Sequence, residues 1–270
     1  MTSTATALVR ACHPEPTAAV TLVAAGVAAS AGAGWPVVVL VAAAVFTGQL
    51  SVGWLNDYLD ADRDNAVSRQ DKPIAAGAVS RRVVGVAVLV AAAACVPLSL
   101  AVGWVAGAVH LVAVVSAWAY NAGLKSTAAS FAPYAVSFGL LPLFILMAAG
   151  RSAPWWLVAA GSLLGTGAHF ANTLPDLADD AATGVRGLPH RLGAAASTGA
   201  AVAAFLAAMG CLLLGPSGPP GLVAVLLVAT ACVVIALALA RPGARRAQAL
   251  FRAIMCTALL AVAMLLTVPL

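Results

Sequence analysis

The chain has 270 residues, of which 63% are hydrophobic and 9% charged, and its mean hydropathy is +1.01. This composition excludes a soluble globular domain and is typical of a polytopic helical membrane protein. The formal charge of +5 indicates membrane topology rather than nucleic acid as a partner, because Lys and Arg concentrate at cytoplasmic membrane ends. The five cysteines are scattered singly, which predicts neither a disulfide framework nor a zinc site.

Apolar runs recur along the whole chain, and a helix needs roughly 20 apolar residues to cross a bilayer. We expect a single all-α domain over residues 1–270, with nine transmembrane helices around a central cavity. The expected spans are 17–33, 36–55, 83–101, 103–121, 129–149, 153–173, 196–214, 220–240 and 248–269. Two long polar loops, 56–82 and 174–195, follow the second and sixth spans.

The positions of the basic residues indicate the orientation of these spans. Nine spans place 13 of the 14 Lys and Arg residues, all except Arg151, on the side that carries the N-terminus and both long loops. By the positive-inside rule this side is cytoplasmic. The sequence therefore predicts a multi-pass protein of the cell membrane, in contact with membrane lipids, whose active site faces the cytoplasm.

A cluster of carboxylates follows the second expected span directly, in the sequence NDYLDADRD at residues 56–64. If the helix continues, Asp57, Asp60 and Asp64 lie at i, i+3 and i+7 and share one face. Charges beside hydrocarbon are costly, so a functional role is favoured over an acidic solvated loop. Carboxylates grouped with the Asn56 amide, without His or Cys, suit a hard cation such as Mg²⁺.

A second polar cluster follows the sixth expected span. Asn172, Asp176 and Asp180 lie at i, i+4 and i+8, again on one face of a continued helix. Because Mg²⁺ commonly binds through carboxylates and substrate phosphates together, we expect the two clusters to flank one diphosphate. Basic residues near the clusters either neutralise phosphate charge or simply mark topology; they are Arg69, Lys72, Lys125, Arg186 and Arg191.

These motifs resemble those of the UbiA superfamily of intramembrane prenyltransferases, and the resemblance covers nearly the whole chain. The matching segments are Asn56-Asp57-x-x-Asp60-x-x-x-Asp64 with Asp71-Lys72-Pro73-Ile74, Tyr120-Asn121 leading to Lys125, Asp176-x-x-x-Asp180-x-x-x-Gly184, and the segment from Arg186 to Gly193 with Arg191 in it.

The resemblance implies a mechanism in which Mg²⁺ binds the diphosphate of an isoprenyl diphosphate. It assigns the metal to Asn56, Asp57, Asp60, Asp64, Asp176 and Asp180, and the diphosphate to Arg69, Lys72, Lys125 and Arg191. Ionisation of the allylic C–O bond would leave a carbocation for an acceptor that the sequence does not identify. Tyr120 would stabilise this cation or position the acceptor, or else is an interfacial aromatic residue.

Four polar residues within or beside the expected spans are candidates to line the cavity: His110, Ser116, Asn121 and His169. His169 either deprotonates an acceptor, orients a carboxylate or is a packing histidine. The chain departs from the family in one respect: many members that prenylate aromatic acids carry an arginine in or near the first helix, whereas the first two spans here contain no basic residue after Arg10. The departure argues against a hydroxybenzoate-type acceptor, because a carboxylate in an apolar cavity needs a partner.

Two other functions remain open. A terpene cyclase would use the same diphosphate site and capture the cation with double bonds of the same isoprenyl chain. A transporter or binding protein for a phosphorylated lipid would carry charges deep in the bundle, whereas this sequence confines its charges to one side.

Overall fold

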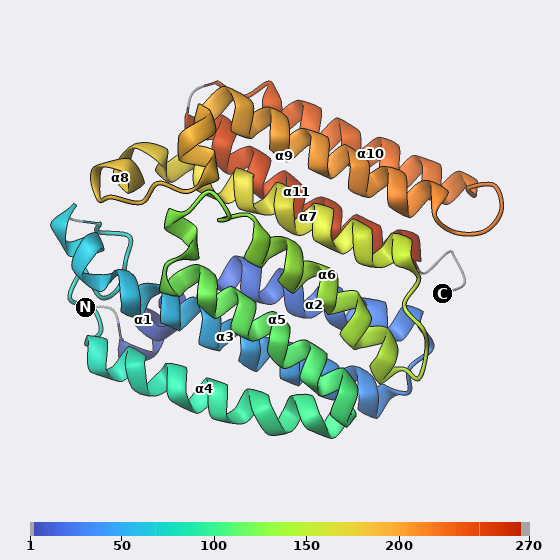
Figure 1. The fold of residues 1–270 in the computed structure, drawn as a ribbon, viewed down its shortest axis with the longest axis horizontal. Helices are drawn as coiled ribbons and strands as arrows, with labels where there is room; N and C mark the ends of the chain where they lie inside the picture. The colour runs from blue at the N-terminus through green and yellow to red at the C-terminus, as the bar shows by residue number, and fades with distance from the viewer. Residues whose placement is uncertain (1–2, 68, 243, 266–270) are drawn as a thin grey trace.

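The computed structural model describes residues 3–67, 69–242 and 244–265, and within these ranges it is helical and contains no strand (Figure 1). The long helices are α2 (Pro14–Ser30), α3 (Trp35–Ala66), α4 (Arg81–Val102), α5 (Trp104–Ala122), α6 (Ala132–Ala148), α7 (Trp155–Thr173), α9 (Leu188–Leu214), α10 (Leu222–Leu239) and α11 (Ala244–Leu265). The short elements are α1 (Thr4–Ala11), α8 (Leu177–Ala182) and two 3₁₀ turns, η1 (Leu124–Ser126) and η2 (Leu174–Asp176).

A long helix covers most of each range that was expected to span the membrane, although residues 266–269 of the last range lie outside the described part of the chain. Among the described helices, five are long and apolar enough to cross a membrane, namely α3, α4, α5, α9 and α10. The apolar helix α6 is shorter. The all-helical class is therefore confirmed, and five helices are candidate membrane spans.

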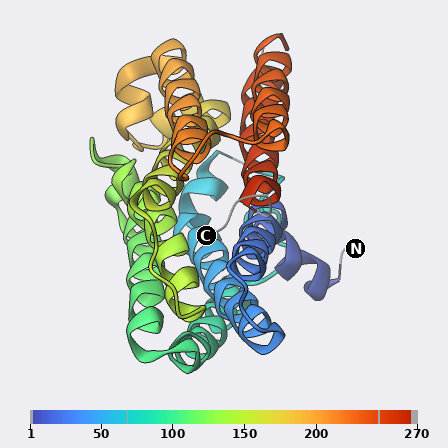
Figure 2. The ribbon, with the colours of Figure 1, turned by 90° about the vertical axis from the view of Figure 1, so that its right-hand side faces the viewer.

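The helices pack mostly against their neighbours in sequence, and α11 returns to pack against α2 and α7 (Figure 2). Most buried side chains belong to one core, with Val41, Phe144 and Phe205 among its fully enclosed members. The segment after α3 and the short helix α8 lie at the same end of the bundle as α1 (Figure 1). Polar connections far apart in sequence therefore meet at one end.

The connection expected over residues 56–82 begins as helix, because α3 continues to Ala66, so the helical continuation through the first aspartates is confirmed and the loop starts later than 56. No Gly or Pro interrupts residues 54–66, and the three aspartates of one face turn inward, so nothing in this stretch ends the helix.

The second expected loop, residues 174–195, also contains helical segments: η2, α8 and the beginning of α9 at Leu188. Pro189 lies in the first turn of α9, where its missing N–H costs nothing. The continuous helix predicted through Asn172, Asp176 and Asp180 was wrong, because α7 ends at Thr173 and Pro175 lies within the turn that follows.

Helices α6 and α7 approach closely at two glycines of α7. A Cβ atom on Gly165 would lie 2.5 Å from the carbonyl oxygen of Tyr134, and one on Gly161 would meet the carbonyl oxygen of Phe138. The two glycines are four residues apart and therefore on one helix face. Small residues at this face allow the backbones to touch, as is common in membrane bundles.

We predict that Gly165→Ala destabilises the protein by about 1–3 kcal/mol, because the added methyl group overpacks the contact with α6. Gly210→Ala in α9 is the control, since nothing lies within 4 Å of a Cβ at that position. The control is expected to be neutral or stabilising by up to about 1 kcal/mol, because alanine favours helix. Thermal unfolding in detergent measures both, and equal melting temperatures for the two variants would contradict the close contact.

Candidate functional site

A cavity of about 510 Å³ runs through the bundle and is polar at one end and apolar at the other. The polar end lies at the C-terminal ends of α3 and α7 and is lined by Asn56, Asp60, Asp64, Asp176 and Asp180, among others. The apolar end is lined by residues of α2, α6, α7, α9 and α11 such as Val27, Ile145, Leu157, Leu212 and Ile254. The cavity can therefore hold a molecule with a charged head and a hydrocarbon tail.

The aspartates of α3 are the most deeply buried charges of this polar end. Asp57, Asp60 and Asp64 are 2%, 6% and 5% exposed, because their i, i+3, i+7 spacing turns all three to the inner face of the helix. The Asn56 amide donates to Asp60 Oδ2 at 3.1 Å and to Asn121 Oδ1 at 3.3 Å. These contacts tie the α3 carboxylates to the end of α5.

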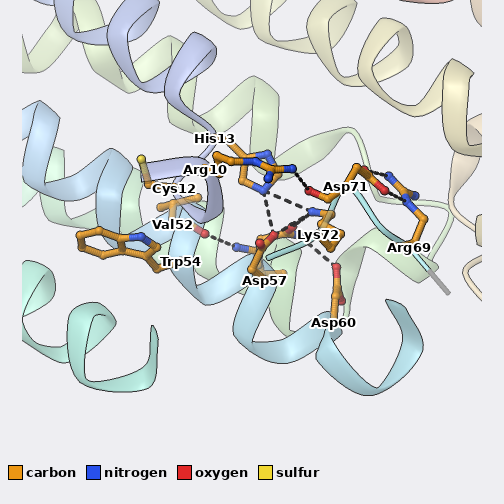
Figure 3. A network of polar contacts seen from close by, with 12 residues as sticks. Arg10, Cys12, His13, Val52, Trp54, Asp57, Asp60, Arg69, Asp71 and Lys72 are labelled. Atoms are coloured by element: carbon orange, nitrogen blue, oxygen red, sulfur yellow. Dashed lines mark hydrogen bonds and ion pairs between the residues drawn. The ribbon is translucent and has the colours of Figure 1, made fainter. Parts of the chain in front are cut away.

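Asp57 is neutralised by residues from outside α3. Lys72 Nζ donates to Asp57 Oδ1 at 2.8 Å, and His13 Nε2 lies 3.1 Å from the same oxygen (Figure 3). Lys72 comes from the segment after α3, which folds back over the helix end, and His13 comes from the junction of α1 and α2. A buried carboxylate needs such partners, so this contact fixes both segments.

Asp60 has two cationic partners. Arg63 Nη2 lies 2.6 Å from Asp60 Oδ2, one helical turn away, and Lys125 Nζ of η1 pairs with Asp60 Oδ1. Burial lowers the pKa of the Lys125 ammonium, while the neighbouring Asp60 carboxylate opposes this change. The Lys125 side chain is 10% exposed and contacts Asp60, so it is held at the cavity rather than solvated at the surface as a residue that only marks topology.

Arg69 joins the first cluster to the second. Its guanidinium donates to both carboxylate oxygens of Asp71 at 2.8 Å and to Asp176 Oδ1 at 3.3 Å (Figure 3 shows the Asp71 contact). The bidentate contact with Arg69 lowers the pKa of Asp71 to about 2. The segment after α3 thus contacts η2, more than a hundred residues later.

Asp180 in α8 is partly buried and lies near His190, with Oδ2 3.4 Å from His190 Nε2. Burial raises the pKa of the Asp180 carboxyl, and the nearby Asp176 acts in the same direction. A cation placed among these carboxylates would relieve that cost, as expected of a metal or substrate site.

The donor atoms fit a hard divalent cation, because carboxylate and amide oxygens of Asn56, Asp60, Asp64, Asp176 and Asp180 line one end of one cavity. Among the described residues, no three His, Cys, Asp or Glu side chains are close enough together to hold a metal as they stand. Their carboxylates instead pair with Lys, Arg and His. Asp64 differs, since no hydrogen bond or ion pair to its carboxylate is found within residues 3–67, 69–242 and 244–265.

The other predicted residues divide into two groups. Tyr120, Asn121, Lys125, His169 and Asn172 line the cavity, as do Arg69 and Lys72. Five predicted residues are not among the described residues that line the cavity: Asp57, His110, Ser116, Arg186 and Arg191. Arg186 and Arg191 are exposed, and Arg191 donates to the Arg186 carbonyl oxygen. His110 lines a small pocket that adjoins the main cavity and shares part of its wall.

Sequence reasoning missed several residues of this site. Arg63 stands inside the first motif, three residues after Asp60, so its spacing was a usable signal. His13 carried no local signal, because its contact with Asp57 depends on the tertiary fold. His190 lies inside the matching segment from Arg186 to Gly193, so its position beside Arg191 was a usable signal for its contact with Asp180. Tyr134, packed edge-on against Tyr120 in the cavity wall, was also missed.

The fold and the site are those of a helical membrane protein whose cavity has an oxygen-rich, charged end and an apolar end. The family model of the UbiA prenyltransferase family matches residues 17–268, and the chain belongs to this family. With its five apolar helices, it is an integral membrane protein. A comparison with curated proteins gives no match.

Solved structures support the fold. An apo UbiA homologue from Aeropyrum pernix is 21% identical, with a TM-score of 0.78 over 94% of this chain and 98% of that chain. A UbiA homologue from Archaeoglobus fulgidus, bound to GPP and Mg²⁺, is 14% identical, with a TM-score of 0.73 over 96% and 99%. A structure of digeranylgeranylglyceryl phosphate synthase is 16% identical, with a TM-score of 0.68 over 98% of both chains.

We predict that Lys72→Met destabilises the metal-free protein by about 3–5 kcal/mol, because it leaves the buried Asp57 carboxylate with one partner fewer. Arg252→Gln is the control, since its pair with Glu15 is exposed on both sides and worth about 0–1 kcal/mol. Chemical or thermal unfolding in detergent without Mg²⁺ checks the difference. A Lys72 variant as stable as the Arg252 variant would show that Asp57 does not depend on this ion pair.

Proposed function

We propose that the protein transfers an isoprenyl group from an allylic isoprenyl diphosphate to a small or lipid-soluble acceptor, with Mg²⁺ as cofactor. The observation that carries this proposal is the single cavity that joins carboxylates of α3, η2 and α8 to an apolar interior. Membership of the UbiA prenyltransferase family supports it. Structures of the Archaeoglobus fulgidus homologue with GPP and Mg²⁺, and with DMAPP and Mg²⁺, support the choice of substrate and metal.

The metal would be held by oxygen atoms of the two clusters that line the cavity: Asn56, Asp60 and Asp64 on one side and Asp176 and Asp180 on the other. When bound, Mg²⁺ would neutralise charge on the diphosphate and make it a better leaving group. Asp57 contributes indirectly, because it orients Lys72 toward the polar end.

The diphosphate would be bound by Arg69, Lys72 and Lys125, which line the polar end. In the absence of ligand these three cations pair with the carboxylates, so substrate and metal together would exchange one set of charge pairs for another. Asn172 and Tyr120 line the same cavity. Arg186 and Arg191 are exposed and are proposed as weaker contacts at the mouth.

In the reaction, the allylic C–O bond breaks and its electron pair leaves with the diphosphate. An electron pair of the acceptor forms the new bond to the allylic carbon, and the acceptor then loses a proton. The Tyr120 ring, packed against Tyr134, presents an aromatic surface to the carbocation. The apolar end holds the isoprenoid tail and keeps water from the cation.

For the orientation we propose nine membrane-spanning helices, a cytoplasmic N-terminus and an active site that opens to the cytoplasm at the cell membrane. Support comes from the asymmetry of the basic residues, 13 of 14 of which lie on one side of nine spans. The polar connections also gather at the end of the bundle that carries α1 (Figure 1).

We predict that Asp60→Asn and Asp180→Asn each lower Mg²⁺-dependent release of diphosphate from GPP by about 10²–10³-fold, because each removes charge that positions the leaving group. Asp62→Asn is the matched control within the same motif. Asp62 is exposed and pairs with Arg81 on the surface, so its loss is expected to change the rate by less than about twofold.

The assay uses purified protein in detergent, with EDTA as the metal-free arm. Release that survives Asp60→Asn, Asp180→Asn or EDTA would overturn the proposed site. Products distinguish the alternative reaction, because cyclic terpene formed from GPP without an acceptor would identify a cyclase.

A further inference from the structure

His169 is the most deeply buried polar residue of the cavity wall. It lies on α7 between the aspartates and the apolar end, is 1% exposed, and packs among Tyr120, Tyr134 and Phe170. It lines the same cavity as the carboxylates. If the diphosphate of a substrate is bound at the aspartates, its isoprenyl group lies next to this polar ring.

The hydrogen bonds of Ser130 assign the tautomer of this ring. The backbone N–H of Leu188 donates to Ser130 Oγ at 2.9 Å, and Ser130 Oγ lies 3.0 Å from His169 Nε2. Because Ser130 is fully buried and its oxygen already accepts from Leu188, its hydroxyl hydrogen is satisfied by donating to Nε2. The proton of the neutral ring is then on Nδ1.

That Nδ1–H group has no hydrogen-bond partner among the described residues. Unpaired buried donors are rare in native proteins and point to a missing ligand or to a functional role. His110 provides a contrast inside the same bundle, because its Nδ1 is paired with Ser99 Oγ at 2.8 Å and it is not among the described residues that line the main cavity. The unpaired donor therefore distinguishes His169 from a histidine that only packs.

The cations of the cavity limit the charge of an occupant. Its described lining residues include four Lys and Arg residues, and all four pair with carboxylates: Arg63 and Lys125 with Asp60, Arg69 with Asp71 and Asp176, and Lys72 with Asp57. In the proposed complex these cations face the diphosphate. No cation among them is left beside His169 for a second anionic group.

We propose that His169 is an acceptor-binding residue whose Nδ1–H donates a hydrogen bond to a hydroxyl or carbonyl oxygen of an uncharged acceptor. This inference rests on the proposed function, since it assigns a substrate class to the same cavity. The hydrogen bond holds the acceptor oxygen beside the aromatic rings of Tyr120 and Tyr134. An acceptor carboxylate is disfavoured there because it would be buried without a positive partner.

The test uses two matched pairs of acceptor probes with GPP and Mg²⁺: methyl 4-hydroxybenzoate with 4-hydroxybenzoate, and 2-naphthol with 3-hydroxy-2-naphthoate. Each pair differs by one carboxylate. We expect the wild-type protein to prenylate the neutral member of a pair in preference to its acid. Prenylation of the acids alone, or of no probe while diphosphate release continues, would overturn the inference.

Two variants of His169 distinguish the role of Nδ1 from that of Nε2. The amide of His169→Gln reaches toward the position of Nε2 and lacks a donor at Nδ1, whereas the amide of His169→Asn lies near Nδ1. We expect His169→Gln to raise the acceptor KM at least tenfold and to leave the GPP KM within twofold, and His169→Asn to raise the acceptor KM less. His110→Gln is the control for burying an amide in the bundle and is expected to change neither KM.

If Nδ1–H only rests against the Tyr134 ring, His169→Gln will lower the melting temperature but leave the acceptor KM unchanged, which overturns the inference. The acceptor-free rate of diphosphate release separates this failure from that of the underlying function. A wild-type protein that releases no diphosphate from GPP would overturn the proposed function and the role of His169 with it.

Discussion

The structure depends on the neutralisation of carboxylates that are buried at the C-terminal end of α3. Asp57 and Asp60 of α3 are nearly inaccessible to solvent. An unpaired charge in such a position would destabilise the folded protein by more than most single contacts stabilise it. Each is met by a Lys, Arg or His from another segment or another turn. These charge pairs order the polar end of the bundle.

The same requirement explains the positions of the segments that flank α3. The helix α1 lies against α3, where Trp54 Nε1 donates to the Leu8 carbonyl oxygen at 2.9 Å and Gly53 leaves room for the backbone at Cys12. This contact brings His13 to Asp57. The segment after α3 returns with Arg69 and Lys72, and it meets Arg10 and His13 over the end of α3 (Figure 3).

The sequence predicted those features that depend on local spacing and composition. The i, i+3, i+7 aspartates indicated the buried face of α3. Hydropathy located the long helices but not all their ends, because α3 continues to Ala66 and α9 begins at Leu188 with polar turns that carry no apolar signal. The sequence did not predict the break at η2 or the partner His13, because these depend on how distant helices pack. The sequence identified His169 only as a candidate. Its Nε2 contacts Ser130, which lies in the connection between η1 and α6, and the unpaired state of its Nδ1 is visible only in the folded structure.

The central claim is that carboxylates of α3 and α8 act together on one Mg²⁺–diphosphate group. Calorimetric titration with GPP, with and without Mg²⁺, tests it in wild-type protein, Asp60→Asn, Asp180→Asn and the double variant. We predict that Mg²⁺ tightens GPP binding in the wild type, that either single variant loses this effect, and that the double variant loses no more than a single one. Losses that add, or a metal effect that survives in Asp180→Asn, would contradict the shared site.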